Sequence, residues 1–212
     1  MEKKKKVSET VIRRLPKYHR YLTDLMEEGE DRISSQELSE LTGFTASQIR
    51  QDLNNFGGFG QQGYGYKVST LREEIEKILG IDVTYKAIVV GAGNLGSVIS
   101  HYKGFRDSGF DIVAIFDKND EVVGTKVGEL EVKHVKKLER YLEKHPDITV
   151  GILTVPKDGA QEIADRLAAA GIKGIWNFAP LDLSAGEGVI VENVRLVDSL
   201  LTLSYYLTDS ER

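Results

Sequence analysis

The sequence predicts an α/β protein of two domains, a small helical N-terminal domain and a larger C-terminal domain built on a doubly wound parallel sheet. The chain has 212 residues, of which 41% are hydrophobic, enough for two domains to bury a core each. Residues 16–56 contain short segments with helical spacing, and from residue 85 onward apolar strand-like runs alternate with helical segments. We expect domains at 1–80 and 81–193 and a C-terminal helix at 194–212.

Composition narrows the possible functions. The chain has no apolar run long enough to cross a bilayer and no apolar signal core after its basic N-terminus, so we expect a soluble, cytoplasmic protein without membrane contact. It has no cysteine, which excludes disulfides and thiolate metal sites. The four histidines lack the spacing of a helical metal site, so we expect no metal. If the protein senses redox state, a bound ligand must do so.

Positive charge is concentrated at the N-terminus. The formal net charge is −5, yet residues 1–20 hold eight Lys and Arg against two Glu. A basic segment beside polar helices favours nucleic-acid binding. For the run Lys3–Lys6 alone, a disordered solubilising tail is an equal alternative.

Three helices are predicted in the N-terminal domain. The first begins near Pro16, whose missing N–H is not needed at the first helical position, and ends at Gly29. The second opens with a serine cap in the stretch 34–37, and the third follows Thr45 directly. The tight turn 42–44 joins these two short helices, which is typical of the helix-turn-helix motif.

The third helix has a polar face suited to reading bases. Ile49 and Leu53 form its inward stripe, so its Arg, Gln and Asn side chains lie on the opposite face, where Arg can pair with guanine and Gln or Asn with adenine. The Gly-rich stretch 57–66 then predicts a short hairpin, a wing beside the helix. The alternatives are a flexible loop and an inert capping bundle.

The second domain follows a connecting helix at 71–79. Strands are predicted at 85–90, 112–116, 148–155, 174–178 and 189–192, and helices at 97–102, 135–144 and 159–170. Strands that alternate with helices in this way predict a Rossmann-like parallel sheet.

The loop 91–96 has the glycine spacing of a dinucleotide site. It follows a strand and opens a helix: Gly91 permits the tight turn, Gly93 lets the backbone approach a pyrophosphate, and Gly96 allows close helix–strand packing. The helix N-terminus offers N–H groups to the phosphates. Asp117 ends the next strand, about 20 residues on, where a carboxylate accepts hydrogen bonds from the ribose and disfavours a 2′-phosphate. We therefore expect NAD(H) as the cofactor.

Binding is favoured over catalysis. The loops 154–156 and 177–180 follow strands and should approach the cofactor, but the sequence offers no histidine paired with an acid and no Ser, Tyr and Lys group at a recognisable spacing. We expect no catalytic residue. An NAD-dependent dehydrogenase with an N-terminal oligomerisation domain is one alternative, and a sensor of coenzyme A or another adenine nucleotide is the other.

The C-terminal segment 194–207 is apolar on nearly all sides of a helix. It either packs into its own domain or is buried against a second subunit. We favour the second possibility, because palindromic DNA requires a two-fold dimer.

Taken together, these pieces resemble the redox-sensing repressors of the Rex family along nearly the whole chain. The resemblance implies a homodimer with winged-helix domains, a Rossmann core and a C-terminal helix exchanged between subunits. It implies repression of fermentation and respiration genes, with NADH releasing palindromic operator DNA and NAD⁺ permitting binding, and it matches Tyr102 to the family tyrosine near the nicotinamide. The resemblance rests on the segments 14–18, 34–38, 49–53, 56–57, 63–66, 91–96, 153–156, 171–175 and 177–178.

The chain departs from the family where many members have basic residues, since it has Gln51 in the third helix and Gln61 and Gln62 in the wing. Fewer phosphate contacts weaken DNA binding and its salt dependence, which leaves the operator sequence open. The cofactor-binding residues expected are Gly91, Ala92, Gly93, Asn94, Leu95, Gly96, Tyr102, Asp117, Lys118, Thr154, Val155, Pro156 and Asn177. The DNA-binding residues expected are Arg14, Lys17, Tyr18, Ser35, Thr45, Ser47, Gln48, Arg50, Gln51, Asn54, Phe59, Gln61, Gln62 and Tyr64.

Overall fold

The computed structural model describes residues 7–61 and 64–210. The chain forms two compact units that divide between Val83 and Thr84. Each unit has a hydrophobic core of its own. Within the described residues, no helix combines the length and apolarity needed to cross a bilayer.

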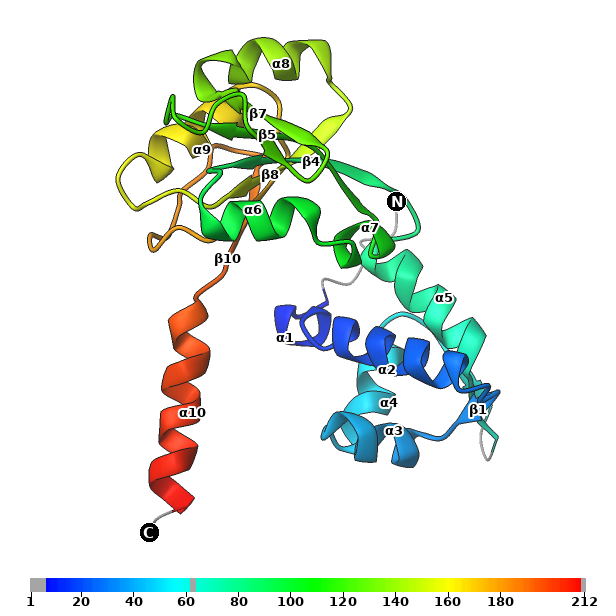
Figure 1. Cartoon of the computed structure of the whole chain (residues 1–212). Helices are drawn as coiled ribbons and strands as arrows, with labels where there is room; N and C mark the ends of the chain where they lie inside the picture. The colour runs from blue at the N-terminus through cyan, green and yellow to red at the C-terminus, as the bar shows by residue number, and fades with distance from the viewer. Residues whose placement is uncertain (1–6, 62–63, 211–212) are drawn as a thin grey trace. The chain divides into compact units, whose positions relative to one another are not determined.

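The N-terminal unit is a winged helix-turn-helix domain (Figure 1). Its helices α3 and α4 form the motif predicted from the sequence, and β2 pairs with β3 antiparallel as the predicted wing. A strand that the sequence did not predict, β1, pairs with the other edge of β3. The elements are α1 (Glu9–Ile12), α2 (Leu15–Glu27), β1 (Arg32–Ile33), α3 (Ser35–Thr42), α4 (Ala46–Asn54), β2 (Gly60–Gln61), β3 (Gly65–Lys67) and α5 (Val68–Leu79).

Both helices of the motif begin with a capping box. The Ser34 hydroxyl accepts a hydrogen bond from the Glu37 N–H at 3.1 Å, and the Glu37 carboxylate accepts one from the Ser34 N–H at 2.7 Å. These bonds lower the pKa of Glu37. Thr45 and Gln48 repeat the arrangement on α4. Each box satisfies two N–H groups that a helix start leaves free, which explains why these short segments are helical.

The core of the N-terminal unit lies where α2, α3, α4 and α5 meet. Each helix contributes an inward stripe, and the turn between α3 and α4 closes on Gly43, whose φ of +73° suits a residue without a side chain. The fully buried members include Leu15, Tyr18, Leu22, Leu38, Ile49, Leu53, Leu71 and Ile75. This core holds α4 with its polar face outward.

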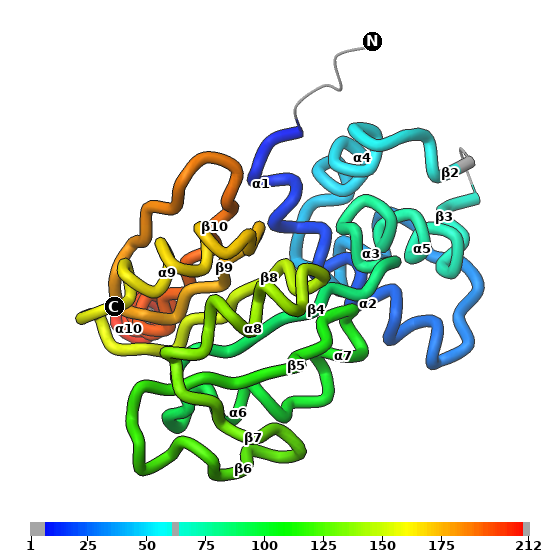
Figure 2. The backbone as a smooth tube through the Cα atoms, turned by 90° about the horizontal axis from the view of Figure 1, so that it is seen from above, coloured from blue at the N-terminus to red at the C-terminus, as the bar shows by residue number. Residues whose placement is uncertain are grey.

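The C-terminal unit contains a seven-stranded sheet in the order β10-β9-β8-β4-β5-β7-β6, and the labels in Figure 2 follow this order. All neighbours pair in parallel except β6, which pairs antiparallel with β7 at the edge. The strands are β4 (Tyr85–Val90), β5 (Phe110–Asp117), β6 (Lys126–Val127), β7 (Leu130–His134), β8 (Ile148–Leu153), β9 (Gly174–Asn177) and β10 (Ile190–Asn193).

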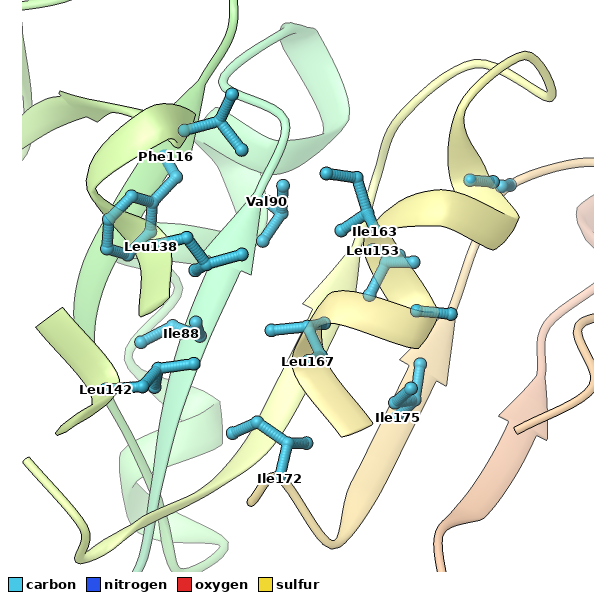
Figure 3. Packing of buried hydrophobic residues seen from close by; sticks show 14 of the residues in the cluster. Ile88, Val90, Phe116, Leu138, Leu142, Leu153, Ile163, Leu167, Ile172 and Ile175 are labelled. Atoms are coloured by element: carbon cyan, nitrogen blue, oxygen red, sulfur yellow. The ribbon is translucent and has the colours of Figure 1, made fainter. Parts of the chain in front are cut away.

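Helices cover both faces of this sheet, as the predicted doubly wound fold requires. On one face α8 (Leu138–Lys144) and α9 (Ala160–Ala169) bury the larger apolar cluster, in which Phe116 packs against Leu138 and Leu153 against Leu167 (Figure 3). On the other face lie α6 (Asn94–His101) and α7 (Gly104–Asp107), which bury a smaller cluster. The remaining elements are the 3₁₀ turn η1 (Val135–Lys137) and α10 (Leu196–Ser210).

The hairpin of β6 and β7 was not predicted from the sequence. Its turn is Gly128-Glu129, and Gly128 has a φ of +60° while the residue after it does not have a positive φ. A two-residue turn with glycine first is the usual hairpin connection. The strand β7 extends the parallel sheet beside β5, so its carboxyl end reaches the edge where the glycine loop lies.

The capping box of α3 gives a stability prediction. The substitution Ser34→Ala should lower the free energy of unfolding of the N-terminal unit by about 1 kcal/mol, because the Glu37 N–H loses its acceptor. Urea unfolding followed by circular dichroism measures this change. Trp176, the only tryptophan, reports the C-terminal unit separately by fluorescence and should not respond.

The matched control is Ser39→Ala, which lies inside the same helix. Alanine has a higher helix propensity than serine inside a helix, so the free energy of unfolding should stay unchanged or rise by roughly 0.5 kcal/mol. Equal losses for both serines would contradict the role given to the cap.

Candidate functional site

The glycine loop is held by direct backbone contact with the end of β8. Gly91 has a φ of +108°, and a Cβ at this position would lie 2.7 Å from the carbonyl oxygen of Thr154. A Cβ at Gly96 would lie 1.8 Å from the Gly91 carbonyl oxygen. The Thr154 hydroxyl donates a hydrogen bond to the Gly91 carbonyl at 2.8 Å. Two of the three glycines are therefore required by the packing of the loop itself.

Gly93 differs from these two glycines. Nothing lies within 4 Å of the position that its Cβ would occupy, and its backbone is extended, with φ −69° and ψ −171°. It is also the N-cap of α6, so the first N–H groups of this helix donate to no capping side chain. An open backbone at an uncapped helix start fits a phosphate group, which needs both close approach and N–H donors.

A cavity of about 820 Å³ opens beside this loop at the carboxyl ends of the strands. This is the usual place and size of a ligand site in an open α/β sheet. Of the expected cofactor residues, Gly91, Gly93, Asp117, Lys118, Thr154, Val155 and Pro156 line the cavity. The sheet thus brings together loops that are more than 60 residues apart in the chain, as in the Gly91–Thr154 bond.

Asp117 lies at the end of β5, as predicted, and its carboxylate is already engaged with backbone. One oxygen accepts a hydrogen bond from the Ala92 N–H at 2.6 Å and the other from the Asn119 N–H at 2.8 Å. A carboxylate has about four lone-pair directions, so two remain for the hydroxyls of a ribose. The bond to Ala92 fixes the carboxylate against the glycine loop, where the sugar next to a bound pyrophosphate would lie.

Several cavity residues were not identified from the sequence. They belong to the loop after β5, to the end of β7 with η1, and to α9 with the loop before it. They include Asn119, Asp120, His134, Lys136, Asp158, Glu162 and Arg166. No histidine paired with an acid was expected from the sequence, but the structure brings His134 Nε2 to 3.5 Å from a carboxylate oxygen of Asp120. The signal that was available was the alternating run 130–134, which is β7.

Six of the expected cofactor residues do not line this cavity, and two of these, Asn177 and Tyr102, lie outside the glycine loop. Asn177 is fully buried, and its amide bonds the Leu181 carbonyl, the Asn193 side chain and the Ala179 N–H, so it closes the loop after β9. Tyr102 ends α6 and is 61% exposed. Ala92, Asn94, Leu95 and Gly96 belong to the glycine loop and the start of α6 without lining the cavity.

Tyr102 is the first ring of an aromatic row across the C-terminal unit. Its ring lies 5.2 Å from that of Phe105, which lies 5.4 Å from Trp176, which lies 4.5 Å from Phe178, and all three pairs meet edge to face. Edge-to-face pairs at these distances are favourable. The row connects the end of α6 with β9.

The predicted base-reading face is exposed on α4. Ser47, Gln48, Arg50, Gln51 and Asn54 all point away from the core, and Thr45 caps the helix. Arg50 donates a hydrogen bond to the Ser35 hydroxyl at 2.8 Å, which connects α4 to the start of α3.

The wing residues differ in exposure. Tyr64 is 69% exposed, whereas Phe59 packs against the core, and Lys17 on α2 lies 5.1 Å from the ring of Phe44. Gln61 lies in β2, and Gln62 falls outside the described residues.

Two expected DNA contacts are placed elsewhere by the structure. Tyr18 is fully buried and its hydroxyl donates to Asp52 at 2.7 Å, because the tyrosine lies on the inward stripe of α2. The Arg14 guanidinium pairs with the same carboxylate, at 2.6 Å and 2.7 Å. The helical spacing of Tyr18 with Leu22 was the available signal that this tyrosine faces the core.

Comparison with known proteins finds relatives along the whole chain. A family model described as a CoA binding domain matches residues 82–181, and one described as a putative DNA-binding protein N-terminus matches residues 6–54. The redox-sensing transcriptional repressor Rex of Clostridioides difficile strain 630 is 58% identical over 98% of both chains. That of Thermoanaerobacter pseudethanolicus is 56% identical over 100% of this chain and 94% of its own. The chain belongs to the Rex family.

Solved structures of a Rex-family repressor, RSP, agree with this assignment. RSP in complex with β-NAD⁺ and operator DNA superposes with a TM-score of 0.91, at 56% identity over 98% of this chain and 95% of that one. RSP in complex with β-NADH superposes with a TM-score of 0.90, at 53% identity over 98% and 97%. The fold described above is therefore the Rex fold in both units.

The glycine loop gives a prediction in which two similar substitutions separate binding from folding. Gly93→Ala should leave the free energy of unfolding unchanged or slightly higher, since a Cβ there meets no atom and φ is negative. It should weaken NADH binding at least about tenfold, or about 1.4 kcal/mol, by blocking the approach of the pyrophosphate. Isothermal titration with NADH and urea unfolding measure the two effects.

Gly96→Ala is the partner variant. It should destabilise the C-terminal unit by about 3 kcal/mol, because its Cβ would overlap the Gly91 carbonyl. Normal NADH affinity in Gly93→Ala, or normal stability in Gly96→Ala, would contradict the division of roles between the two glycines.

Proposed function

We propose that this protein is a homodimeric repressor that binds palindromic operator DNA and is released by NADH, so that the NADH/NAD⁺ ratio controls genes of fermentation and respiration. One observation carries the proposal. A chain of the Rex family combines the exposed polar face of α4 with a glycine loop whose backbone is accessible at Gly93. RSP, which is 56% identical, has been crystallised with β-NAD⁺ and operator DNA.

The cavity residues support NAD(H) as the effector. Gly93 and the uncapped start of α6 suit the pyrophosphate, and the free lone pairs of Asp117 suit the ribose and disfavour a 2′-phosphate. Lys118, Thr154, Val155 and Pro156 complete the wall of the site. When bound, the cofactor supplies a nicotinamide ring that is positively charged as NAD⁺ and neutral as NADH, and apolar aromatic surroundings such as those around Tyr102 favour the neutral ring.

The outer face of α4 supports reading of DNA. Arg50 suits guanine, and Gln48, Gln51 and Asn54 suit adenine. The backbone or the groove beside it would be contacted by Ser47, Ser35, Thr45, Lys17 and Tyr64. The expected wing contacts of Gln61 and Gln62 rest on the sequence alone. Phe59 supports the wing from beneath. Because Gln51 stands where many family members have a basic residue, we expect fewer phosphate contacts and a shallower salt dependence.

The dimer is supported by two apolar surfaces of the C-terminal unit. Every side chain of α10 from residue 196 to 209 is exposed, and its large apolar side chains are 52% to 64% exposed. A helix that is apolar on nearly all sides is stable when it is buried. The second surface is a hollow of about 460 Å³ on the uncovered part of the sheet, whose lining includes Phe105, Ile112, Ile152, Trp176 and Ile190. We propose that α10 of each subunit is buried on the other.

The aromatic row suggests how the cofactor and the dimer interface are coupled. Tyr102, matched to the family tyrosine near the nicotinamide, contacts Phe105, and both Phe105 and Trp176 line the apolar hollow. We infer that NADH favours one packing of this row and NAD⁺ or the empty site another, which changes the spacing of the two recognition helices. The two ligands must bind the two states unequally for this to occur.

We propose no enzymatic activity. His134 and Asp120 form a histidine–acid pair, but β7 lies on the Asp117 side of the glycine loop, where the adenosine ribose belongs, and not where a hydride would be transferred. A repressor acts where the DNA is, so we place the protein in the cytoplasm. Turnover of NADH with a small carbonyl compound would support a dehydrogenase instead, and competition of CoA with NADH would support a CoA sensor.

The decisive experiment is a gel-shift titration with the operator duplex that was crystallised with RSP, at fixed salt, adding NADH and NAD⁺ separately. NADH should release the duplex and NAD⁺ should not. Asp117→Ala and Gly93→Val should bind the duplex normally and lose the response to NADH, with Asn119→Ala, a neighbour on the cavity rim, as the milder control. An unchanged NADH response in both variants would sink the sensor, and no binding by the wild type would sink the repressor.

The dimer proposal gives a prediction for Leu200→Glu, which places a charge on the apolar side of α10. This variant should shift the protein from dimer to monomer in sedimentation velocity. It should also move the fluorescence emission of Trp176 toward longer wavelength, because the apolar hollow that Trp176 lines is no longer covered by α10. Thr202→Glu adds the same charge on the polar side of the helix, near Asp198, and should leave the dimer intact. Dissociation by both variants, or by neither, would contradict burial of the apolar side.

A further inference from the structure

The recognition helix α4 carries a buried carboxylate. Asp52 is 2% exposed and is one of three buried polar side chains among the residues that the structure describes, with Thr42 and Asn177. Its neighbours in the chain, Gln51 and Arg50, are exposed on the opposite side of α4. A buried aspartate is costly unless its charge is paired and hydrogen-bonded, so its partners matter.

All the partners of Asp52 come from one end of α2. Arg14, the N-cap of α2, donates from Nε at 2.6 Å and from Nη2 at 2.7 Å, which is the bidentate arrangement. The Tyr18 hydroxyl, one turn further on, donates at 2.7 Å. The pairing raises the pKa of Arg14, and burial together with the bond to Asp52 raises the pKa of Tyr18, so both side chains remain protonated donors at neutral pH.

The same end of α2 also contacts the turn of the helix-turn-helix motif. The Tyr18 ring meets Phe44 edge to face at 5.8 Å, and the guanidinium of Arg14 lies 5.8 Å from the same ring. The position of α4 along and around its axis is thus fixed at two points, the turn before it and the carboxylate near its end. The apolar contacts of Ile49 and Leu53 turn this side of α4 toward the core, but hydrophobic packing is not directional, so the hydrogen bonds of Asp52 set the rotation more narrowly.

We propose that Arg14, Tyr18 and Asp52 form a positioning network for operator recognition, which sets the rotation of α4 and thereby aims Arg50 and Gln51 at the bases. The network itself touches no DNA. The proposal rests on the function proposed above and adds three residues whose role is to hold others. Successive side chains point about 100° apart around an α-helix, so Arg50 and Gln51 face the bases only at one rotation of α4. Phosphate contacts carry no sequence information and depend less on this rotation. A small error in the rotation of α4 should therefore weaken base contacts more than phosphate contacts.

The competing role for Arg14 is a direct phosphate contact, which the sequence analysis expected. The two roles predict opposite effects of Asp52→Asn. If Arg14 binds phosphate, removal of the carboxylate charge frees it and strengthens binding to any duplex. If the network positions α4, operator binding weakens while binding to a scrambled duplex does not fall.

The experiment uses the full-length protein and the operator duplex crystallised with RSP, with a scrambled duplex of equal length as the non-specific probe. Tyr18→Phe removes one hydroxyl and Asp52→Asn removes the charge with almost no change of shape. Each should weaken operator binding at least about tenfold and leave the scrambled duplex within about twofold. Tyr21→Phe is the matched control, because it deletes a hydroxyl from the same helix without touching Asp52.

A double-mutant cycle with Arg50→Ala distinguishes positioning from loss of fold. If Tyr18 acts through the reading face, Tyr18→Phe should cost little more once Arg50 is gone, whereas a lowered folded fraction would cost the same factor in both backgrounds. Circular dichroism during urea unfolding checks that each variant is folded at the assay temperature. Tyr18→Phe is the milder variant and remains informative if Asp52→Asn does not fold.

The outcomes test the proposed function and the positioning network separately. Failure of the wild type to prefer the operator overturns the proposed function. If the wild type prefers the operator, three results overturn the positioning network alone. These are additive losses in the double-mutant cycle, unchanged operator binding by Tyr18→Phe, and tighter binding by Asp52→Asn. Loss confined to the operator and absent from the Arg50→Ala background supports it.

Discussion

The C-terminal unit depends on one close approach of backbone to backbone, between the glycine loop and the end of β8. Gly91 and Gly96 leave no room for a side chain, and the Thr154 hydroxyl bonds the Gly91 carbonyl across the contact. Because the start of α6 is brought this close to the sheet, its free N–H groups face the edge where the strands end. This backbone contact therefore determines where the cavity lies, where Asp117 is placed and in which direction α6 leads to Tyr102.

The sequence was sufficient for the parts of the fold that are encoded by local pattern. Helical spacing with Ser34 and Thr45 as caps predicted α3 and α4, and the strand–glycine–helix order predicted the loop of the dinucleotide site. The hairpin of β6 and β7 was missed because its strands are short and its turn carries a single glycine. His134 and Lys136 reach the cavity through β7 of that hairpin, so they were missed with it, and Asp120 lies in the loop between β5 and the hairpin.

Side-chain partners were less predictable than elements. A tyrosine and an arginine near the start of α2 suit DNA as well as they suit a buried carboxylate, and Asp52 sits 34 and 38 residues away from them in the chain. Asn177 similarly follows a strand that ends at the cofactor edge, yet its side chain turns inward to bond Leu181 and Asn193. Periodicity reveals which side of a helix or strand a residue occupies, whereas the choice between solvent and a polar partner depends on the tertiary fold.

The exposed apolar surface of α10 has a consequence for the protein in the cell. If α10 is buried on a second subunit as proposed, a newly made subunit presents a row of leucines and tyrosines before it assembles, and such a surface promotes non-specific association as readily as assembly. The apparent thermal stability of the protein should therefore rise with its concentration, as for proteins that complete their folding on association. Synthesis at very low copy number would leave a larger share of the chains exposed to proteases, so the level of expression itself becomes part of how much functional protein is present.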